Sequence, residues 1–370
     1  MKSKLGKITG ATLAALLIIL MAANLIVPLV KPAFATPIGS GPDALGAYTG
    51  PRNGYNTDDN VKASLDALQT KVLMQQLVAT QTGSLPNGAV YYVDGATGDD
   101  ADDGLSRTNA VATIVQGITL SNAAYVIEAA AGNGTMMNVI IIAGGTYTED
   151  IEAFPANCHV IGTGSFTRIQ NLGTHTCAGV DNSHFWNISF RGGTAGAAMI
   201  SVANSSHSLG FHNCIFESQA TISSVLYYAG SSSNQIIEDC EIGYETAVAN
   251  SPDIAIHLYG THCQRMKIIN NRIWSTGVGI QIENMTSGNF LLVKDNVIAA
   301  ANSTTDQMTI GINDATSGPK GGTYVNNYIS AADAIQFHGT SVNVTSENIC
   351  IGNWVNEAGT PAWQDGGTID

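Results

Sequence analysis

Charged residues are scarce in this chain, and basic residues are the scarcest. Only 12% of the 370 residues are charged, and 15 Lys and Arg against 29 Asp and Glu give a net charge of −14. Such a chain lacks the positive surface through which proteins bind nucleic-acid phosphates, so nucleic acid is excluded as a partner. It also repels polyanionic sugars unless a divalent cation bridges them.

Long hydrophobic runs are absent after the N-terminus, and so are familiar catalytic and metal-binding motifs. The six Cys residues form no Cys-x-x-Cys pair and fit no zinc spacing. The sequence contains no nucleophile elbow, phosphate-binding loop or zinc-protease motif. Gly, by contrast, is abundant, with 40 residues. This composition is typical of an all-β chain with many tight turns.

The one long apolar run, residues 11–30, follows three Lys residues near the N-terminus. Ala33 and Ala35 then provide the small residues that a signal peptidase reads. The pattern predicts a secretory signal peptide over 1–35 and a secreted or cell-surface protein. An uncleaved anchor is the alternative, because the run is about long enough to cross a bilayer. Contact with a membrane is expected only through this segment.

Two further segments precede the main domain. Residues 36–56 are rich in Gly, Pro and Asn and are predicted to form a linker. Residues 57–83 are predicted to form an amphipathic helix, whose apolar residues recur at spacings of four and three. This seam contains Val61, Leu65, Leu68, Val72 and Ala79. It suits a short coiled coil that holds a homotrimer, or a lone helix packed on the next domain.

A line of the form Ile-x-Asn-Asn-x-Ile recurs along the rest of the chain. Its clearest copies lie at 267–273, 292–298 and 323–329. One position of each copy fixes the register: Ile188, Cys214, Cys240, Asn271, Asn296, Asn327 and Asn348. The steps between these positions are 26, 26, 31, 25, 31 and 21 residues. A period of this length indicates stacked supersecondary units.

A second short strand follows each copy, with apolar and polar residues alternating in most copies, as in 255–259 and 279–283. The repeats predict an all-β fold, a right-handed single-stranded parallel β-helix of about eight coils at 90–356, with a tail at 357–370. The anchor Asn residues are predicted to point inward and stack as a ladder, since buried amides need partners. Cys240 and Cys214 would extend this ladder.

The start of this domain resembles the opening of pectin-lyase-like proteins. Residues 90–106 contain a Tyr-Val-Asp strand and a Gly-Asp-rich loop that ends Asp-Gly-Leu-Ser, and residues 139–151 carry an apolar strand that runs into Gly-Thr-Tyr. The resemblance covers about residues 90 to 356 and implies the parallel β-helix fold. It does not select a function, because the fold carries lyases, hydrolases, phage tailspikes and adhesins alike.

Two features of this domain have alternative interpretations. Cys214 and Cys240 occupy equivalent positions of adjacent repeats, about 4.8 Å apart if the repeats stack. That spacing permits either a disulfide or two reduced core thiols. The acidic loop offers calcium ligands at Asp99, Asp100, Asp102 and Asp103. A purely structural loop is the favoured interpretation, because Asp-Gly pairs commonly form turns. No other cofactor is expected.

The outward face of the second strands is the best candidate binding site. Aromatic side chains can stack on sugar rings, and amides, imidazoles and carboxylates can bind hydroxyls. The predicted substrate-binding residues are Tyr228, His257, Tyr259, Gln281, Asn313, Gln336 and His338. A polysaccharide or cell-surface glycan is therefore the expected partner. The alternative is a plain solvated face.

Two classes of function stay open. The first is an exported surface or fibre protein, structural or adhesive, that binds carbohydrate along this face. The second is a secreted polysaccharide lyase or glycoside hydrolase, with Glu283 and Asp314 as candidate catalytic carboxylates. The catalytic sets of the pectin-lyase-like enzymes are missing from the coils, which favours the first class. His159, His175 and His184 are interpreted as scattered structural residues.

Overall fold

The computed structural model describes residues 88–357 except 133, 135, 164–166, 172, 204–205, 231, 246–249, 261–263, 284–289, 301–307, 316–321, 339–343 and 347. The chain divides into two compact units, 1–74 and 75–370, and the described residues all belong to the second. The signal peptide at 1–35, the linker at 36–56, the helix at 57–83 and the tail beyond 357 were predicted from the sequence. They lie outside the described part.

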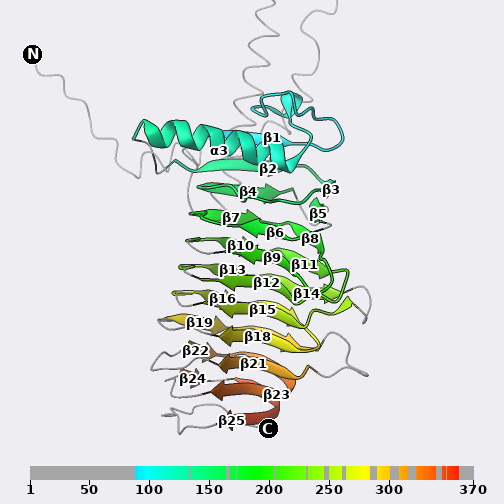
Figure 1. Ribbon diagram of the computed structural model, residues 1–370, viewed down its shortest axis with the longest axis vertical. Helices are drawn as coiled ribbons and strands as arrows, with labels where there is room; N and C mark the ends of the chain where they lie inside the picture. The colour runs from blue at the N-terminus through cyan, green and yellow to red at the C-terminus, as the bar shows by residue number, and fades with distance from the viewer. Residues whose placement is uncertain are drawn as a thin grey trace, which may run out of the picture. The chain divides into compact units, whose positions relative to one another are not determined.

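The described chain begins with strand β1 (Val90–Val93), the 3-10 turn η1 (Arg107–Asn109) and helix α3 (Ile114–Ala130). The hydroxyl of Thr113 accepts a hydrogen bond from the amide of Gln116, and the carboxylate of Glu149 accepts from the first two amides of the helix. These bonds satisfy the helix N-terminus, whose amides have no partner within the helix. The helix packs against β1 and β2 at the first coil (Figure 1). Within the described residues, no helix is long and apolar enough to span a membrane.

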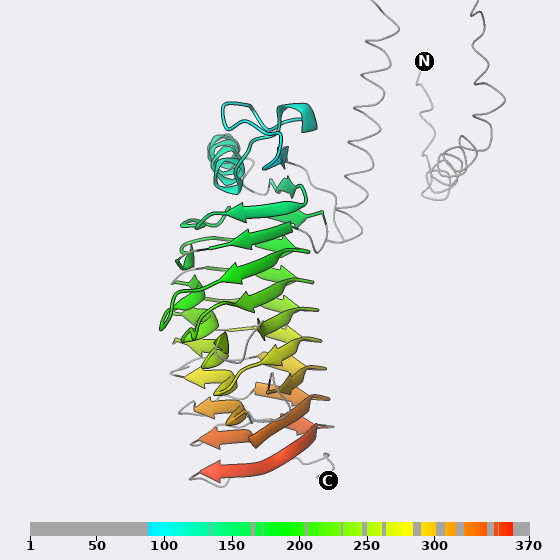
Figure 2. The same cartoon turned by 90° about the vertical axis from the view of Figure 1, so that its right-hand side faces the viewer.

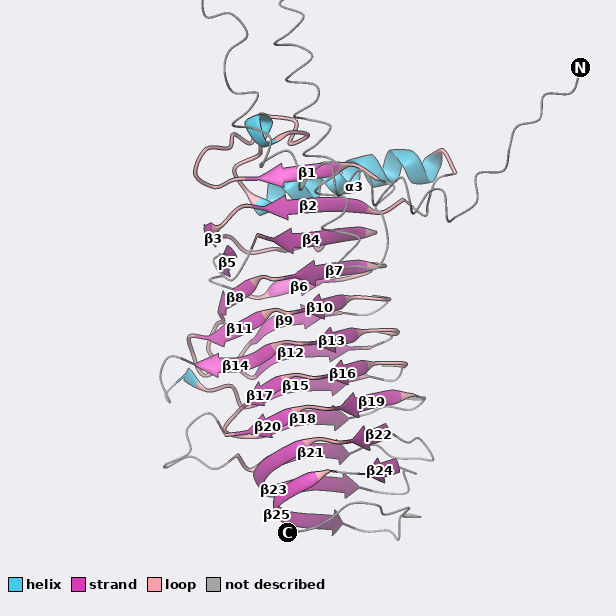
Figure 3. Ribbon diagram, turned by 180° about the vertical axis from the view of Figure 1, so that it is seen from behind, coloured by secondary structure: helices cyan, strands magenta, loops and turns pink. Residues whose placement is uncertain are grey.

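Two long sheets make up the rest, and every strand pair within them is parallel. The first is a ten-stranded sheet of β1, β2 (Asn138–Ile142), β4 (Cys158–Gly162), β7 (Ser183–Trp186), β10 (Gly210–His212), β13 (Ile236–Glu238), β16 (Lys267–Ile269), β19 (Leu291–Lys294), β22 (Gly322–Val325) and β24 (Val344–Ser346). Its strands lie side by side in chain order (Figure 3).

The second sheet contains two series of strands that meet at β23 (Tyr328–His338). One series is β3 (Gly145–Thr148), β5 (Thr167–Gln170), β8 (Ser189–Gly192), β11 (Ile215–Ser218), β14 (Glu241–Glu245), β17 (Arg272–Trp274) and β20 (Val297–Ala299). The other is β6 (His175–Cys177), β9 (Ala198–Val202), β12 (Ser224–Ala229), β15 (Ile254–Tyr259), β18 (Val278–Glu283) and β21 (Ile310–Ala315). The final strand, β25 (Ile349–Glu357), pairs with β23.

Each coil therefore takes one strand from the ten-stranded sheet and one from each series of the other, except that in the last two coils the long strands β23 and β25 each replace both. From β4 to β25 the described residues contain eight such coils, stacked one above another (Figure 2). This confirms the predicted parallel β-helix. The interior is apolar and includes stacked aromatic rings, such as Phe190 and Phe216 on adjacent coils with centroids 5.2 Å apart.

An internal ladder of amides runs along the bend after the ten-stranded sheet. Asn271, Asn296, Asn327 and Asn348 are all buried, and each amide nitrogen donates to a backbone carbonyl. The first three also donate to the side-chain oxygen of the next anchor, at 2.9–3.0 Å. The predicted ladder is confirmed. The residues before the first three anchors, Asn270, Asp295 and Asn326, have positive φ angles of 55°, 58° and 53°, so they make the bend.

The ladder continues through two cysteines. The amide of Cys240 donates to Asn271 Oδ1 at 2.9 Å, and the amide of Cys214 donates to Cys240 Sγ at 3.4 Å. Both thiols are free and buried, as are Cys158, Cys177 and Cys350. Of the two alternatives left open by the sequence, the structure has the stacked thiols. Burial raises the pKa of the Cys240 thiol well above its usual range.

Candidate functional site

The sequence-predicted site lies on the outer face of β12, β15, β18 and β21. The strands pair in register, which places Tyr227, His257, Gln281 and Asn313 in one column across four coils. Gln336 of β23 follows in the same column. Tyr259 and Glu283 form a second column two residues further along. Five of the seven predicted substrate-binding residues are therefore brought together on one face.

A chain of hydrogen bonds links the polar members of these columns. Asn313 Nδ2 donates to Gln281 Oε1 at 3.0 Å, and Gln281 Nε2 donates to Glu283 Oε1 at 2.8 Å. The other carboxylate oxygen of Glu283 lies 3.3 Å from His257 Nε2. Asn313 Oδ1 is buried and accepts no hydrogen bond from the described residues.

Aromatic rings border this polar chain at its upper end. The rings of Tyr227 and Tyr259 have centroids 6.1 Å apart at an interplanar angle of 27°, and His257 lies edge-on to both. The side chain of Tyr259 is 40% exposed. A flat exposed ring beside fixed amides and a carboxylate is an arrangement that suits a sugar ring, with stacking on one side and hydroxyl contacts on the other.

The prediction for Tyr228 is wrong. Tyr228 is fully buried, and Tyr227 faces outward in its place. The strands align Tyr227, rather than Tyr228, with Ser201 and His257. A shift of one residue exchanges the two faces of a strand. Asn313 does face outward, but beside Gln281 rather than beside Glu283. The side chain of His338 lies outside the described part.

The two candidate catalytic carboxylates do not face one another. Glu283 points outward, whereas Asp314 is buried in the interior, where it accepts a hydrogen bond of 2.8 Å from the hydroxyl of Tyr324. Asp314 pairs with Ile282, the inward neighbour of Glu283. Glycoside hydrolysis needs two carboxyl groups on either side of one bond, and this pair cannot provide them.

The acidic loop binds its own backbone. Asp99 and Asp103 each accept a hydrogen bond from the amide two residues ahead, while Asp100 accepts from the amides of Ala112 and Thr113. These bonds fix the loop that leads into α3. In the described ranges, no group of three or more His, Cys, Asp or Glu side chains is placed to hold a metal ion.

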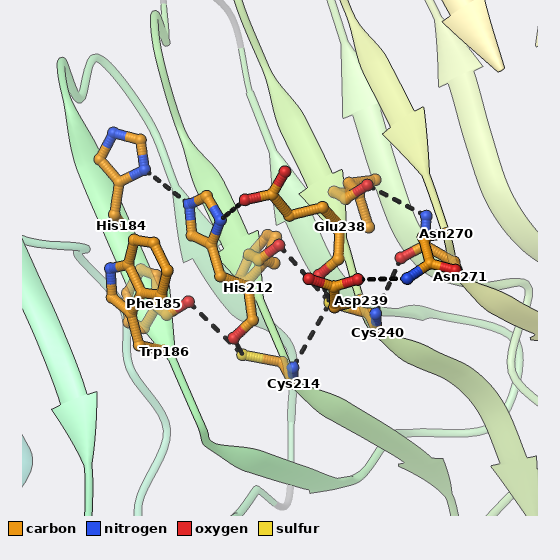
Figure 4. A network of polar contacts seen from close by, with 12 residues as sticks. His184, Phe185, Trp186, His212, Cys214, Glu238, Asp239, Cys240, Asn270 and Asn271 are labelled. Carbon is orange, nitrogen blue, oxygen red and sulfur yellow. Dashed lines mark hydrogen bonds and ion pairs between the residues drawn. The ribbon is translucent and has the colours of Figure 1, made fainter. Parts of the chain in front are cut away.

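A second polar cluster lies on the outer face of the ten-stranded sheet, and the sequence did not reveal it (Figure 4). His159, His184 and His212 stand on the successive strands β4, β7 and β10, followed by Glu238 on β13. His184 Nδ1 lies 2.9 Å from His212 Nε2, and His212 Nδ1 lies 2.7 Å from Glu238 Oε1. The interpretation of His159 and His184 as scattered residues is therefore wrong. His175 does lie apart, on β6 in the other sheet.

Burial changes the ionisation of this cluster. The pKa of His159, His184 and His212 is lowered to about 4 in each case, mainly because burial disfavours the charged imidazole and also because a neighbouring imidazole repels it. The pKa of Glu238 is raised, first by burial and then by the nearby charge of Asp239. The imidazoles are therefore neutral at pH 7.

Several solved structures resemble this chain. The pectate lyase Pel9A superposes with a TM-score of 0.51 at 11% identity, over 75% of this chain and 80% of that chain. The pectin methylesterase PemA from Erwinia chrysanthemi superposes with a TM-score of 0.46 at 13% identity, over 74% of this chain and 92% of that chain. PfbA, a surface adhesin of Streptococcus pneumoniae, superposes with a TM-score of 0.41 at 12% identity, over 66% of this chain and 77% of that chain.

At these identities the likeness defines the fold alone. The chain has the pectin-lyase-like right-handed parallel β-helix fold, as the residues at its start implied. No protein-family model matches the chain, and no curated protein matches it. Function therefore has to be argued from the two sites themselves.

Proposed function

We propose that this chain is an exported surface protein that binds a glycan along the outer face of β12, β15, β18 and β21. The observation that carries this proposal is the alignment of two stacked tyrosines with a hydrogen-bonded polar chain over four coils. Tyr227 and Tyr259 offer ring faces, and Asn313, Gln281 and Glu283 offer fixed polar atoms. Export is supported by the signal-peptide pattern over 1–35.

The charge of the site favours an uncharged glycan. Glu283 is the one carboxylate among the hydrogen-bonded side chains of this face described above, and the protein as a whole has a net charge of −14. A uronate polymer would meet repulsion from both. Neutral or amino sugars would not, and their hydroxyls and amides can donate to the exposed carboxylate of Glu283.

Binding to a panel of neutral, amino and acidic oligosaccharides on a glycan array tests this proposal, with calorimetry on the best ligand. Tyr259→Ala should weaken binding about tenfold, as expected for a lost ring contact of about 1–2 kcal/mol. Tyr328→Ala is a matched control, because Tyr328 is 39% exposed but lies in a different part of the second sheet. Equal losses in both variants would contradict a site on this face.

The same panel separates binding from catalysis. A glycan-binding protein leaves the oligosaccharides intact, whereas a lyase or hydrolase releases products. Product release that disappears in Glu283→Gln would replace the binding function by an enzymatic one. Absence of binding to every neutral and amino sugar would leave only the structural function of the coils.

A further inference from the structure

The cluster on the ten-stranded sheet contains a linear chain of ionisable groups that the glycan proposal does not use. The chain runs from Glu238 on β13 through His212 on β10 to His184 on β7, with contacts of 2.7 Å and 2.9 Å (Figure 4). The ring centroids of the two imidazoles are 5.2 Å apart, so the facing nitrogens lie close to the line that joins the rings. That alignment is the geometry of a hydrogen bond between the rings.

The hydrogen bonds fix the tautomers. With Glu238 ionised, its carboxylate can only accept, so His212 carries its proton on Nδ1. His212 Nε2 is then an acceptor, and His184 must donate to it from Nδ1. His184 Nε2 is left with a lone pair and no proton. A carboxylate that orients one imidazole is a known way to prepare a base, and here a second imidazole is added.

Both ends of this relay are partly exposed, since the side chain of Glu238 is 32% exposed and His184 is half-buried. His212 is 5% exposed, whereas His184 is partly exposed. Trp186 stacks on His212 with centroids 3.7 Å apart and rings nearly parallel, which covers the middle of the chain. A reactant can therefore reach the relay at His184, while the imidazole of His212 in the middle is shielded from water.

The backbone is adapted to this contact. Gly210 pairs with His184 across the strands and lies two residues before His212. A Cβ at Gly210 would collide with both His184 Nδ1 and His212 Nε2. Glycine is therefore required for the two rings to meet. The amides of the internal Asn ladder also link coils, but an amide does not titrate, whereas this chain can accept a proton at one end.

We propose that His184 is a general base whose Nε2 activates water or a hydroxyl for attack on an uncharged ester, with His212 and Glu238 as positioning residues. His184 Nε2 takes a proton from the attacking oxygen as that oxygen bonds to the ester carbonyl carbon. The bond from the carbonyl carbon to the leaving alkoxide then breaks, and the proton on Nε2 passes to the leaving oxygen. The imidazolium formed in between is stabilised by Glu238 through His212. An ester and water give an acid and an alcohol.

This site is separate from the proposed glycan face. His184, His212 and Glu238 belong to the ten-stranded sheet, whereas Tyr259 and Glu283 belong to the other. Either site can therefore fail without the other. An uncharged ester is the expected substrate class because the buried neutral imidazoles offer no fixed cation to hold an anionic group.

Hydrolysis of p-nitrophenyl acetate by the untagged full-length chain tests the proposal. His184→Gln should lower kcat/KM at least tenfold, and Glu238→Gln should lower kcat with little change in KM. His207→Gln is the control, since His207 is exposed and pairs with Asp181 outside the cluster. Retention of the full rate in His184→Gln, or a rate no higher than that of an equal concentration of imidazole, would overturn the assignment.

The pH profile distinguishes this base from an ordinary histidine. With a pKa of about 4, His184 stays neutral at pH 5. The titration of His184 should change the rate, corrected for hydroxide, less than twofold between pH 7 and pH 5, whereas a base with a pKa of about 6.5 loses about 25-fold. Glu238, whose pKa is raised, adds a loss only where its carboxylate takes up a proton. An acid limb near pH 6.5 would contradict His184 as the base.

A chemical probe gives an answer even if the variants fail to fold. Diethyl pyrocarbonate transfers its ethoxycarbonyl group to an unprotonated imidazole nitrogen and releases ethanol and carbon dioxide. On the unmodified protein, mass spectrometry should find His184 labelled at pH 5 nearly as fast as at pH 7, with the exposed His207 as the positive control for labelling at pH 7. If His207 is labelled at pH 7 and His184 is not, the lone pair is inaccessible and the proposal is wrong.

Discussion

Asn296 Nδ2 donates a hydrogen bond of 2.9 Å to Asn327 Oδ1, across 31 residues of sequence and one coil of the helix. The same nitrogen donates to the carbonyl of Ile268, and the side-chain oxygen of Asn296 accepts from the backbone amide and the side-chain amide of Asn271. One buried side chain thus makes four hydrogen bonds and connects three coils. Its removal would leave buried groups without partners on both sides.

Asn296→Ala should therefore lower the free energy of unfolding by about 3 kcal/mol, since each unsatisfied buried group costs about 1–3 kcal/mol. Urea denaturation of both proteins measures this difference. Asn326→Gly is the control, because Asn326 lies at an exposed bend with a φ of 53° that glycine adopts without strain. That variant should change the stability by less than about 1 kcal/mol. A similar loss in both would mean that the ladder adds nothing specific.

Neighbouring tyrosines on β12 should respond in opposite ways. Tyr227→Ala should weaken glycan binding and leave the free energy of unfolding within about 1 kcal/mol of the original, because the ring lies on the outer face. Tyr228→Ala should lower it by about 3–5 kcal/mol, because the fully buried ring leaves a cavity. Denaturation and calorimetry on each variant decide this. The reverse pattern would show that the register of β12 is wrong.

Acid should destabilise the fold through His175. Burial lowers the pKa of this imidazole to about 4, and its Nδ1 accepts a hydrogen bond from the amide of Ile151. The unfolded chain binds a proton near pH 6.5 and the folded chain does not until about pH 4. Stability is therefore complete above about pH 6.5 and falls as the pH drops toward 4, by about 3 kcal/mol at most for this residue.

Denaturation at a series of pH values should thus show less stability at pH 4.5 than at pH 7. In His175→Gln the decline should be shallower, because Gln does not titrate. His159, His184 and His212 have the same direction of shift and supply the decline that remains. A stability that rises as the pH falls from 7 to 4.5 would contradict the buried neutral state of all four.

Gly210→Ala should disrupt the relay from the backbone side. The added Cβ would collide with His184 Nδ1 and His212 Nε2, so the rings must separate. We expect a loss of about 1–3 kcal/mol in the free energy of unfolding, as for other overpacked sites, together with loss of the ester hydrolysis. Gly134→Ala is the control, since a Cβ there meets no atom within 4 Å. If Gly210→Ala keeps both stability and hydrolysis, the contact between the rings is not needed.

The sequence determined the coil and its spine. Anchor residues such as Asn271 and Asn296 recur at a period that matches one turn of the β-helix, and a buried amide at that position has partners only above and below it. The residues before these anchors, such as Asn270, make the bend with a positive φ, which Asn tolerates. His257, Gln281 and Tyr259, predicted to lie on one outward face, do lie together on β15 and β18.

Only the tertiary structure decided the rest, because side chains on adjacent coils meet according to a register that the sequence leaves open. In β12 two apolar residues, Val225 and Leu226, are followed by two tyrosines, Tyr227 and Tyr228. The strand therefore has no alternation of apolar and polar residues that would determine which tyrosine faces outward. His184 and His212 are 28 residues apart in sequence and lie on adjacent strands, but they are not directly opposite each other. His184 pairs with Gly210, and its ring reaches past this glycine to His212. No local pattern encodes such a contact, since it depends on how far one coil is shifted against the next.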